Sequence, residues 1–237
     1  MPRIALVDLV RGIAILGVVV FHLVWDLAFL RFIPVDWAFN RWWLLFGRVL
    51  AGTFVLLVGV SLVLATRHGF HPQSFWRRLA ILLVAAAAIT IVTRFIFPDT
   101  YVYFGILHAI AVGSVLGAVM LRLSSFVLIL SAIVVLVLGI IVESPTFDPR
   151  WLAWTGFAVA APPSNDFVPV FPWVGLTLLG MVLARATIER HWFDVLTFRH
   201  GRWTASVSWC GRHSLVIYLI HQPLLLGAIV PIARLMA

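Results

Sequence analysis

The sequence predicts an all-α integral membrane protein, folded as a bundle of about seven transmembrane helices. Hydrophobic residues make up 63% of its 237 positions, and charged residues only 11%. A soluble domain needs far more charge on its surface, so the lipid bilayer must supply the solvent. Most of the chain also divides into apolar stretches of about 20 residues, the length that a helix needs to cross a bilayer. We therefore expect a single transmembrane domain over residues 1–237.

The expected spans are apolar runs bounded by proline, glycine or charged residues. They cover residues 4–30, 40–66, 76–97, 101–121, 124–143, 170–186 and 207–233. The first run is too long and too rich in polar side chains for a signal peptide, so we expect a mature helix. Residues 151–161 are too short to cross and run into two prolines. We expect an interfacial or re-entrant segment near 151–165, where protein or water must satisfy the backbone.

The basic residues favour contact with phosphate groups at a membrane over nucleic acid. All 17 are arginine, and the formal net charge is +8. They lie singly between the spans and form no basic stripe, which suits anionic lipids or a phosphorylated cofactor and excludes nucleic acid. Cys210 is the only cysteine in the sequence, so we expect neither an internal disulfide nor a thiolate metal cluster.

The arginines also predict the orientation, because positively charged loops are retained in the cytoplasm. With the N-terminus inside, nine arginines fall on the cytoplasmic side and five on the outside. The nine are Arg3, Arg67, Arg77, Arg78, Arg122, Arg185, Arg190, Arg199 and Arg202; the five are Arg31, Arg41, Arg94, Arg150 and Arg234. We expect a bacterial cytoplasmic membrane protein with its N-terminus inside and its C-terminus outside.

The first apolar run carries four ionisable side chains on one face. Asp8, Arg11, His22 and Asp26 share with Ile15 a sector of roughly 60° at about 100° per residue. A charge in hydrocarbon costs about 2.5–3.5 kcal/mol even on a lenient scale, so this stripe is expected to be functional. His22 and Asp26 are one turn apart, close enough for the carboxylate to orient the imidazole as a general base. The alternative is a polar pair that only locks helix packing.

The ionisable side chains of this stripe lie at two different depths in the membrane. A rise of about 1.5 Å per residue places His22 about 27 Å from Ile4, toward the outer leaflet. Asp8 and Arg11 stay near the cytoplasmic face. Arg11 could hold a phosphate from inside, or it could pair with Asp8 or extend to lipid headgroups.

Later spans bring further polar side chains to the outer half. Arg48 lies early in the second run, His108 early in the fourth and His221 late in the seventh, so all three can approach His22. Each histidine could instead be a hydrogen-bonded core residue. Arg48 could simply neutralise Asp26 or Asp166.

Zinc binding and transport are the competing interpretations of these polar side chains. Three histidines and two aspartates could bind zinc, but no paired motif such as His-Glu-x-x-His occurs, so we expect no metal. Polar stripes also mark the paths of transporters, although no symmetry between the two halves of the chain supports one.

Several segments carry a family resemblance. They are residues 7–15 with the pattern Asp-x-x-Arg-Gly, 22–27, 52–54, 58–61, 104–110, 166–173 and 211–223. Together they resemble the catalytic domain family of heparan-alpha-glucosaminide N-acetyltransferase, within the wider group of transmembrane acyltransferases. The resemblance covers nearly the whole chain.

The resemblance implies a transmembrane acyltransferase domain over residues 1–237. It would move an acyl group, expected to be acetyl, from cytoplasmic acyl-CoA to an amine or hydroxyl of an extracytoplasmic sugar or glycan. His22 matches the active-site histidine of the family. The expected catalytic residues are His22, Asp26, His108, His221 and Asp166; the expected acetyl-CoA-binding residues are Arg11, Arg48, Arg212 and Asp8.

The identity of the acceptor does not carry over from the family. Direct attack by the acceptor and a covalent acyl-histidine stay open as mechanisms. The alternative function is a transporter or lipid-binding scaffold without acyl transfer. Besides acyl-CoA, the acceptor and membrane lipids, a second copy of the chain is a partner that the small residues Gly175 and Gly180 permit.

Overall fold

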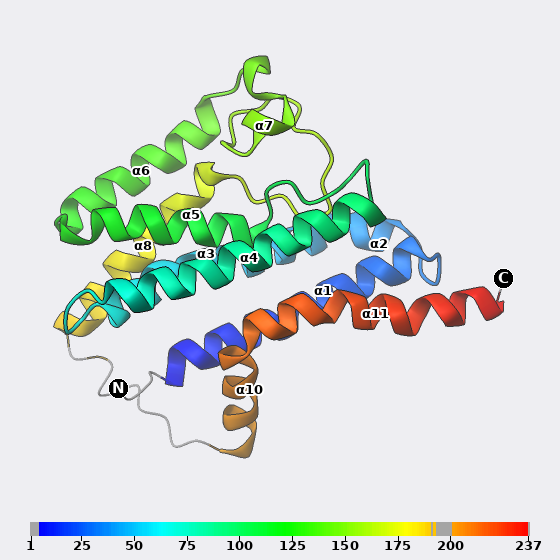
Figure 1. The fold of residues 1–237 in the computed structure, drawn as a ribbon, viewed down its shortest axis with the longest axis horizontal. Helices are drawn as coiled ribbons and strands as arrows, with labels where there is room; N and C mark the ends of the chain where they lie inside the picture. The colour runs from blue at the N-terminus through cyan, green and yellow to red at the C-terminus, as the bar shows by residue number, and fades with distance from the viewer. Residues whose placement is uncertain (1–4, 191, 193–200, 237) are drawn as a thin grey trace. The chain divides into compact units, whose positions relative to one another are not determined.

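The long apolar runs form long helices in the computed structural model, which describes residues 5–190, 192 and 201–236. Five helices have the length and the apolar composition to cross a membrane. They are α1 Ala5–Phe29, α3 Arg41–Ala65, α4 Pro72–Ile96, α8 Val170–Glu189 and α11 Ser214–Met236 (Figure 1). The protein is therefore a helical membrane protein, as predicted.

Shorter helices connect or accompany these five. They are α2 Asp36–Phe39, α5 Ile106–Val119, α6 Ser125–Ile141, α7 Arg150–Ala153 and α10 Arg202–Arg212, with 3-10 turns at Met120–Arg122 and Pro145–Phe147. Helices α5 and α6 are apolar but have only 14 and 17 residues. The predicted count of about seven spans is therefore not confirmed. The described residues form no strand, only an isolated bridge between Phe104 and Phe167.

The last predicted span, 207–233, begins later than expected. Residues 207–212 belong to α10, and His213 lies outside the helical region at φ −105° and ψ 18° before α11 starts at Ser214. Gly211, two residues before His213, lies against the backbone of α1 at Asp8, so the packing of α10 on α1 accompanies the change of direction. Within residues 151–165 only α7 is helical, with four residues, so this segment is too short to cross, as predicted. Arg3, Arg199 and His200 lie outside the described residues.

The chain divides into two compact units. The first comprises Met1–Thr53 and Phe193–Ala237, and the second comprises Phe54–Trp192. Helix α3 contributes its first half to one unit and its second half to the other. The expectation of a single functional domain stays a prediction.

Close backbone contact holds α10 against α1 in the first unit. A side-chain carbon added at Gly12 would collide with the carbonyl oxygen of Val207, and one added at Gly211 would collide with that of Asp8. Only glycine fits at these two positions, because the helix backbones themselves touch there. The contact fixes α10 across the first turns of α1.

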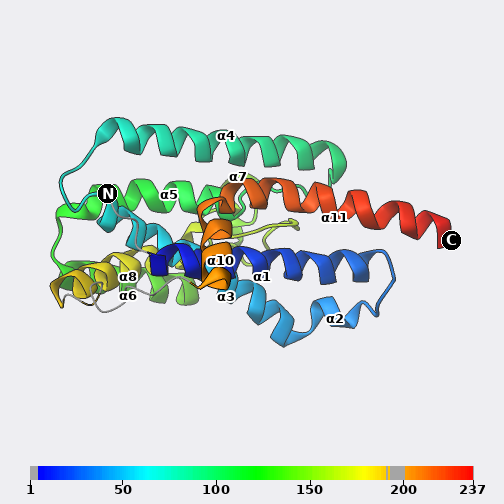
Figure 2. The same ribbon diagram turned by 90° about the horizontal axis from the view of Figure 1, so that it is seen from below.

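Helices α1 and α11 run in the same direction, as Figures 1 and 2 both show. His22 of α1 contacts His221 of α11, and Asp26 of α1 contacts Gln222 of α11. Successive crossings of a membrane alternate in direction, so two parallel helices require an odd number of crossings from α1 to α11. Five and seven crossings both satisfy this condition. Which end is cytoplasmic stays a prediction.

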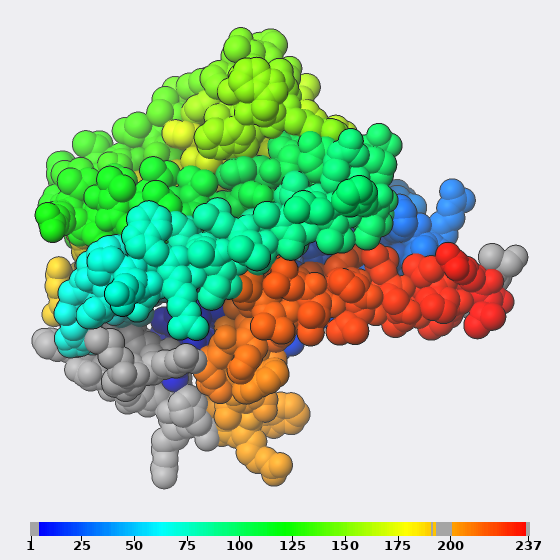
Figure 3. All heavy atoms as spheres, in the orientation of Figure 1, coloured from blue at the N-terminus to red at the C-terminus, as the bar shows by residue number. Residues whose placement is uncertain are grey.

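The outer surface of α11 is apolar over most of its length. Its exposed side chains include Val216, Ile220, Leu224 and Ile232. Figure 3 shows the atoms of α11, in orange and red, on the face toward the viewer. Contiguous exposed apolar side chains of this kind are typical of contact with lipid.

In the second unit, the latter half of α3 packs closely on α8. A side-chain carbon at Gly59 would collide with the carbonyl oxygen of Thr177, and one at Gly180 would collide with that of Leu56. The Thr177 hydroxyl donates a hydrogen bond to the Val55 carbonyl at 3.1 Å. Helix α8 also contacts α5 and α6, so it forms the centre of this unit.

Candidate active site

Two histidine rings meet in the first unit, where α1 and α11 lie together. The ring centroids of His22 and His221 are 5.0 Å apart, and the ring planes are inclined by 55°. His221 is 6% exposed, and Asp26, one turn beyond His22, is 2% exposed. The inward-facing stripe predicted for the first helix therefore does face other helices at this end.

The hydrogen bond of His221 indicates which of its ring nitrogens carries hydrogen. Nδ1 lies 2.7 Å from the carbonyl oxygen of Tyr218. A carbonyl oxygen only accepts, so Nδ1 must be the donor. In the neutral ring Nε2 then holds a lone pair, and this buried atom has no partner among the described residues. The ring that contacts His22 thus retains an unused hydrogen-bond acceptor.

Asp26 accepts its hydrogen bond from Gln222 rather than from His22. Gln222 Nε2 lies 2.7 Å from Asp26 Oδ1 because α11 brings the amide opposite the carboxylate. The predicted hydrogen bond between His22 and Asp26 is not among those that the described residues form. Asp26 can still act on His22 through its charge, since one helical turn separates them and the surroundings are poorly screened.

The cluster leaves three buried atoms without a hydrogen-bond partner in the described part of the chain. They are Asp26 Oδ2, His221 Nε2 and Gln222 Oε1. Buried unmatched polar atoms are rare, and each costs about 1–3 kcal/mol. All three atoms are acceptors, so the cluster is suited to a molecule that supplies N–H or O–H groups.

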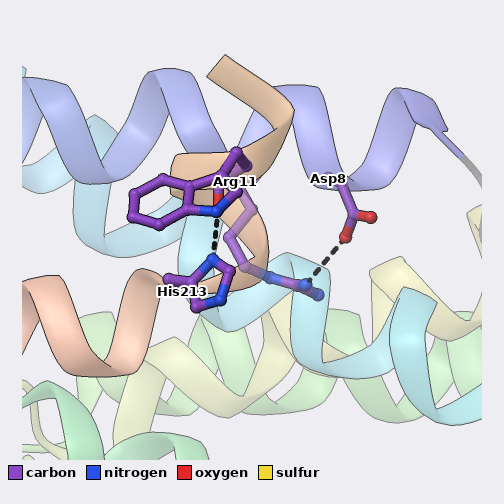
Figure 4. Close-up of polar contacts among 4 residues, drawn as sticks. Asp8, Arg11 and His213 are labelled. Atoms are coloured by element: carbon purple, nitrogen blue, oxygen red, sulfur yellow. Dashed lines mark hydrogen bonds and ion pairs between the residues drawn. The ribbon is translucent and has the colours of Figure 1, made fainter. Parts of the chain in front are cut away.

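Asp8 and Arg11 form an ion pair at the opposite end of the stripe (Figure 4). Arg11 Nη1 lies 3.4 Å from Asp8 Oδ1, and Asp8 is buried. Pairing with Asp8 was one of the alternatives left open for Arg11. A role in binding phosphate stays a prediction for both residues.

The junction of α10 and α11 lies beside this ion pair, as Figure 4 shows for His213. His213 Nδ1 is 2.9 Å from the carbonyl oxygen of Trp209. Arg212, in the last turn of α10, is exposed. Its guanidinium is therefore accessible to a ligand, which leaves its predicted role in binding acyl-CoA open.

The predicted approach of Arg48 to His22 stays a prediction. Arg48 is exposed on α3, and the described part of its own unit gives its guanidinium no hydrogen bond or ion pair. Its predicted contact with the donor stays a prediction.

His108 lies in the second unit, in the first turn of α5, and its ring belongs to an ordered chain of hydrogen bonds. The Gly105 N–H donates to His108 Nδ1 at 3.2 Å. His108 Nε2 lies 3.4 Å from the Thr90 hydroxyl, which donates to the Val102 carbonyl at 2.7 Å. Nδ1 accepts, so in the neutral ring Nε2 carries the hydrogen and donates to Thr90. Both ring nitrogens are thus engaged in holding the start of α5.

Asp166 caps the same helix. Its Oδ2 accepts from the Ile106 N–H at 2.8 Å, and a negative charge is favourable at a helix N-terminus. A side-chain carbon at Gly105 would collide with this carboxylate, so the glycine makes room for the cap. The predicted approach of His108 and Asp166 to His22 would join the two units, and it stays a prediction.

Tyr103 fixes the segment that precedes α5. Its hydroxyl donates to the Pro162 carbonyl at 3.1 Å. Burial raises the pKa of this phenol to about 12, although the Arg150 guanidinium opposes the shift. The hydroxyl therefore stays protonated, and able to donate, at physiological pH.

Sequence reasoning missed Gln222 and Thr90. Gln222 follows His221 directly within an apolar run, and a polar amide in such a run is the signal that could have found it. Thr90 gave no such signal, because threonine is common in transmembrane helices and its hydroxyl can bond to its own backbone.

Among the residues that the structure describes, no three histidine, cysteine or acidic side chains group as metal ligands would.

Long apolar helices with a buried imidazole and carboxylate between two of them place the chain among the helical membrane proteins that carry ionisable side chains within their spans. A search of curated proteins and a search of solved structures found no match. The chain belongs to the family described as the catalytic region of heparan-alpha-glucosaminide N-acetyltransferase, which it matches over residues 3–223. The predicted family is confirmed, and membership assigns the protein to the membrane transferases.

Proposed function

We propose that the protein moves an acetyl group from cytoplasmic acetyl-CoA to an amine or hydroxyl of an extracytoplasmic sugar or glycan. The observation that supports this proposal is the set of three unmatched acceptors, Asp26 Oδ2, His221 Nε2 and Gln222 Oε1, in the cluster that contains His22. An acceptor amine or hydroxyl brings the N–H or O–H groups that such a cluster needs. It would then lie within reach of an imidazole base.

In the proposed reaction, His22 takes a proton from the acceptor while the acceptor nitrogen or oxygen attacks the thioester carbonyl carbon. A new C–N or C–O bond forms, and the C–S bond breaks. The imidazolium then returns its proton to the departing CoA thiolate. Asp26 would stabilise the transient positive charge, because a carboxylate and an imidazolium attract strongly where water is excluded.

The donor side of the proposal rests on the inner end of α1. Arg11 is about 16 Å along the helix from His22, at about 1.5 Å per residue, a distance that an extended pantetheine arm can span. Arg11 and the exposed Arg212 would hold the CoA phosphates, with Asp8 orienting Arg11. Arg48 would neutralise further phosphate charge.

We propose that the main role of His108 and Asp166 is to position the start of α5. Their hydrogen bonds hold the start of α5, and a direct part in the reaction would be additional to that role.

The test uses purified protein in lipid nanodiscs with radiolabelled acetyl-CoA, with glucosamine and methyl glucoside as probe acceptors. His22→Ala should lower the rate of label transfer by about 10²- to 10⁴-fold, the usual contribution of a general base. His68→Ala is the matched control, because His68 is exposed in the loop between α3 and α4. A wild-type transfer rate in His22→Ala would contradict the proposal.

The same preparation distinguishes the two mechanisms. An acyl-histidine intermediate predicts that acetyl label stays on the protein when acceptor is omitted, and that His22→Ala loses this label. Direct attack predicts no retained label. A transporter would move labelled solute into sealed vesicles with no change in its chemical form.

A further inference from the structure

A pocket of about 620 Å³ opens in the first unit where α1, α2 and the start of α3 meet. Its volume lies within the range of about 300–1,000 Å³ that is typical of small-molecule sites. Its lining includes Asp36, Trp37, Asn40, Trp42, Trp43 and Phe46. The pocket is thus mainly aromatic, with one carboxylate and one amide.

Besides its carboxylate, the pocket is lined by two residues with nitrogen-bearing side chains that matter here, Trp43 and Asn40. The indole nitrogen of Trp43 is buried and has no hydrogen-bond partner within the described residues. Since this nitrogen has almost no accessible surface, Trp43 contributes ring carbons rather than its N–H to the lining. Asn40 Oδ1 accepts from the Trp42 backbone N–H at 2.9 Å, which leaves the amide nitrogen of Asn40 to donate to a ligand.

A short chain of ring contacts connects the pocket to His22. Phe21 stacks on Trp43 with a centroid distance of 5.7 Å and nearly parallel planes. The same Phe21 ring meets His22 edge-on at 5.5 Å. A molecule bound against Trp43 would therefore lie one aromatic ring away from the proposed base.

The lining also limits the charge of the ligand. Asp36 is the one charged side chain among the described residues that line the pocket. The guanidinium of Arg41 lies over the Trp42 ring at 5.0 Å but does not line the pocket. A carboxylate wall repels anions and favours neutral or cationic groups.

We propose that this pocket holds a pyranose ring of the acceptor and selects neutral or amine-bearing sugars over anionic ones. A pyranose has an apolar face that can lie on an indole, and a rim of hydroxyls that can accept from the Asn40 amide nitrogen and donate to Asp36. This inference rests on the proposed function, because it treats the sugar as the acceptor of the acetyl group. It adds where the sugar binds and which sugars are excluded.

The test measures sugar binding without acetyl-CoA, so it does not depend on transfer. Saturation-transfer NMR on the nanodisc protein would compare glucosamine, methyl glucoside and glucuronic acid. We expect signals from the first two and at least a tenfold weaker affinity for glucuronic acid. Asp36→Asn should reduce this discrimination to less than threefold.

Substitution of an aromatic lining residue tests whether the rings of the pocket bind the sugar. Trp42→Ala removes an exposed indole of the lining, and should weaken methyl glucoside binding by about three- to tenfold, as expected for the loss of one aromatic contact. Trp203→Ala is the matched control, because Trp203 is 86% exposed on α10 and does not line the pocket. Thermal unfolding of each variant would exclude global misfolding as the cause.

Two outcomes would overturn the inference. One is the absence of saturation for all three sugars while His22-dependent transfer proceeds, which would place the acceptor elsewhere and leave the proposed function standing. The other is preferential saturation of glycerol 1-phosphate, which would identify a lipid headgroup site. Sugar binding without any acetyl transfer would instead refute the proposed function and support the pocket.

Discussion

The two units of the molecule differ in how the histidines inside them are hydrogen-bonded. In the first unit, His221 and its neighbours Asp26 and Gln222 each leave a buried acceptor without a partner in the described chain. In the second unit, both nitrogens of His108 have partners, and Asp166 caps a helix. The first cluster keeps acceptors that no described residue uses, whereas the second is hydrogen-bonded within the chain.

This difference separates two reasons for placing a polar side chain inside a membrane protein. A matched network adds rigidity and specifies one packing arrangement. An unmatched cluster costs stability, so it is expected at sites where a ligand supplies the missing partners. Substitutions in the first cluster should therefore affect chemistry, and substitutions in the second should affect stability.

Among the substitutions that test this difference between the units, the largest effect is expected from Asp26→Asn. This change keeps the shape and the oxygen that accepts from Gln222, but removes the negative charge beside His22. We expect kcat to fall about 100-fold, equivalent to about 2.7 kcal/mol in the activation barrier, with little change in thermal stability. Steady-state transfer assays and thermal unfolding would measure the two quantities. Asp99→Asn, at an exposed loop carboxylate, is the control, and an unchanged kcat in Asp26→Asn would remove the distinction between the clusters.

An intermediate effect is expected from Asp166→Ala. Loss of the cap on the Ile106 N–H should lower the free energy of unfolding by about 1–2 kcal/mol. The kcat of the folded protein should stay within about threefold of the wild type. Denaturant titration in detergent would measure the first quantity and a transfer assay the second. A 100-fold loss of kcat at unchanged stability would instead establish the catalytic role predicted from the sequence.

The smallest effect is expected from Tyr103→Phe, and it depends on pH. Burial raises the pKa of Tyr103 to about 12 from 10.0, so its neutral form is favoured in the folded state. The resulting stability is fully present below about pH 10 and is lost as the pH rises toward 12. The variant also lacks the hydrogen bond to Pro162, worth about 1 kcal/mol. We expect the difference in melting temperature between wild type and variant to shrink from pH 9 to pH 12; a constant difference would contradict this.

Much of the fold followed from hydropathy alone. Predicted spans 4–30 and 40–66 differ from α1 and α3 by one residue at each end, because long apolar runs have few alternatives to a helix in lipid. The break before Ser214 was missed, since Ser208 and Gly211 are compatible with an apolar helix until packing against α1 is known. The short lengths of α5 and α6 were likewise not predicted, because the ends of these helices depend on the turns that connect them.

The arrangement of the site residues could be predicted from the sequence only where those residues lie on the same helix. The spacing of Asp8, His22 and Asp26 indicated a common face, and both aspartates of that face are buried. The pairing of Asp26 with Gln222 could not be predicted, because it depends on the rotation of α11 against α1. Sequence alone also could not distinguish the engaged ring of His108 from the open ring of His221. That distinction requires the positions of a backbone N–H and a hydroxyl from other segments.

The contact between α1 and α11 has a consequence for synthesis of the protein in the cell. Asp26 and its partner Gln222 are separated by 196 positions in the chain, so the ribosome makes the two halves of this cluster at widely different times. A nascent chain that has inserted every earlier helix still lacks His221 and Gln222. Any reactivity that needs both helices must therefore wait for insertion of α11, and chains that stall before this point should be inert toward acetyl-CoA.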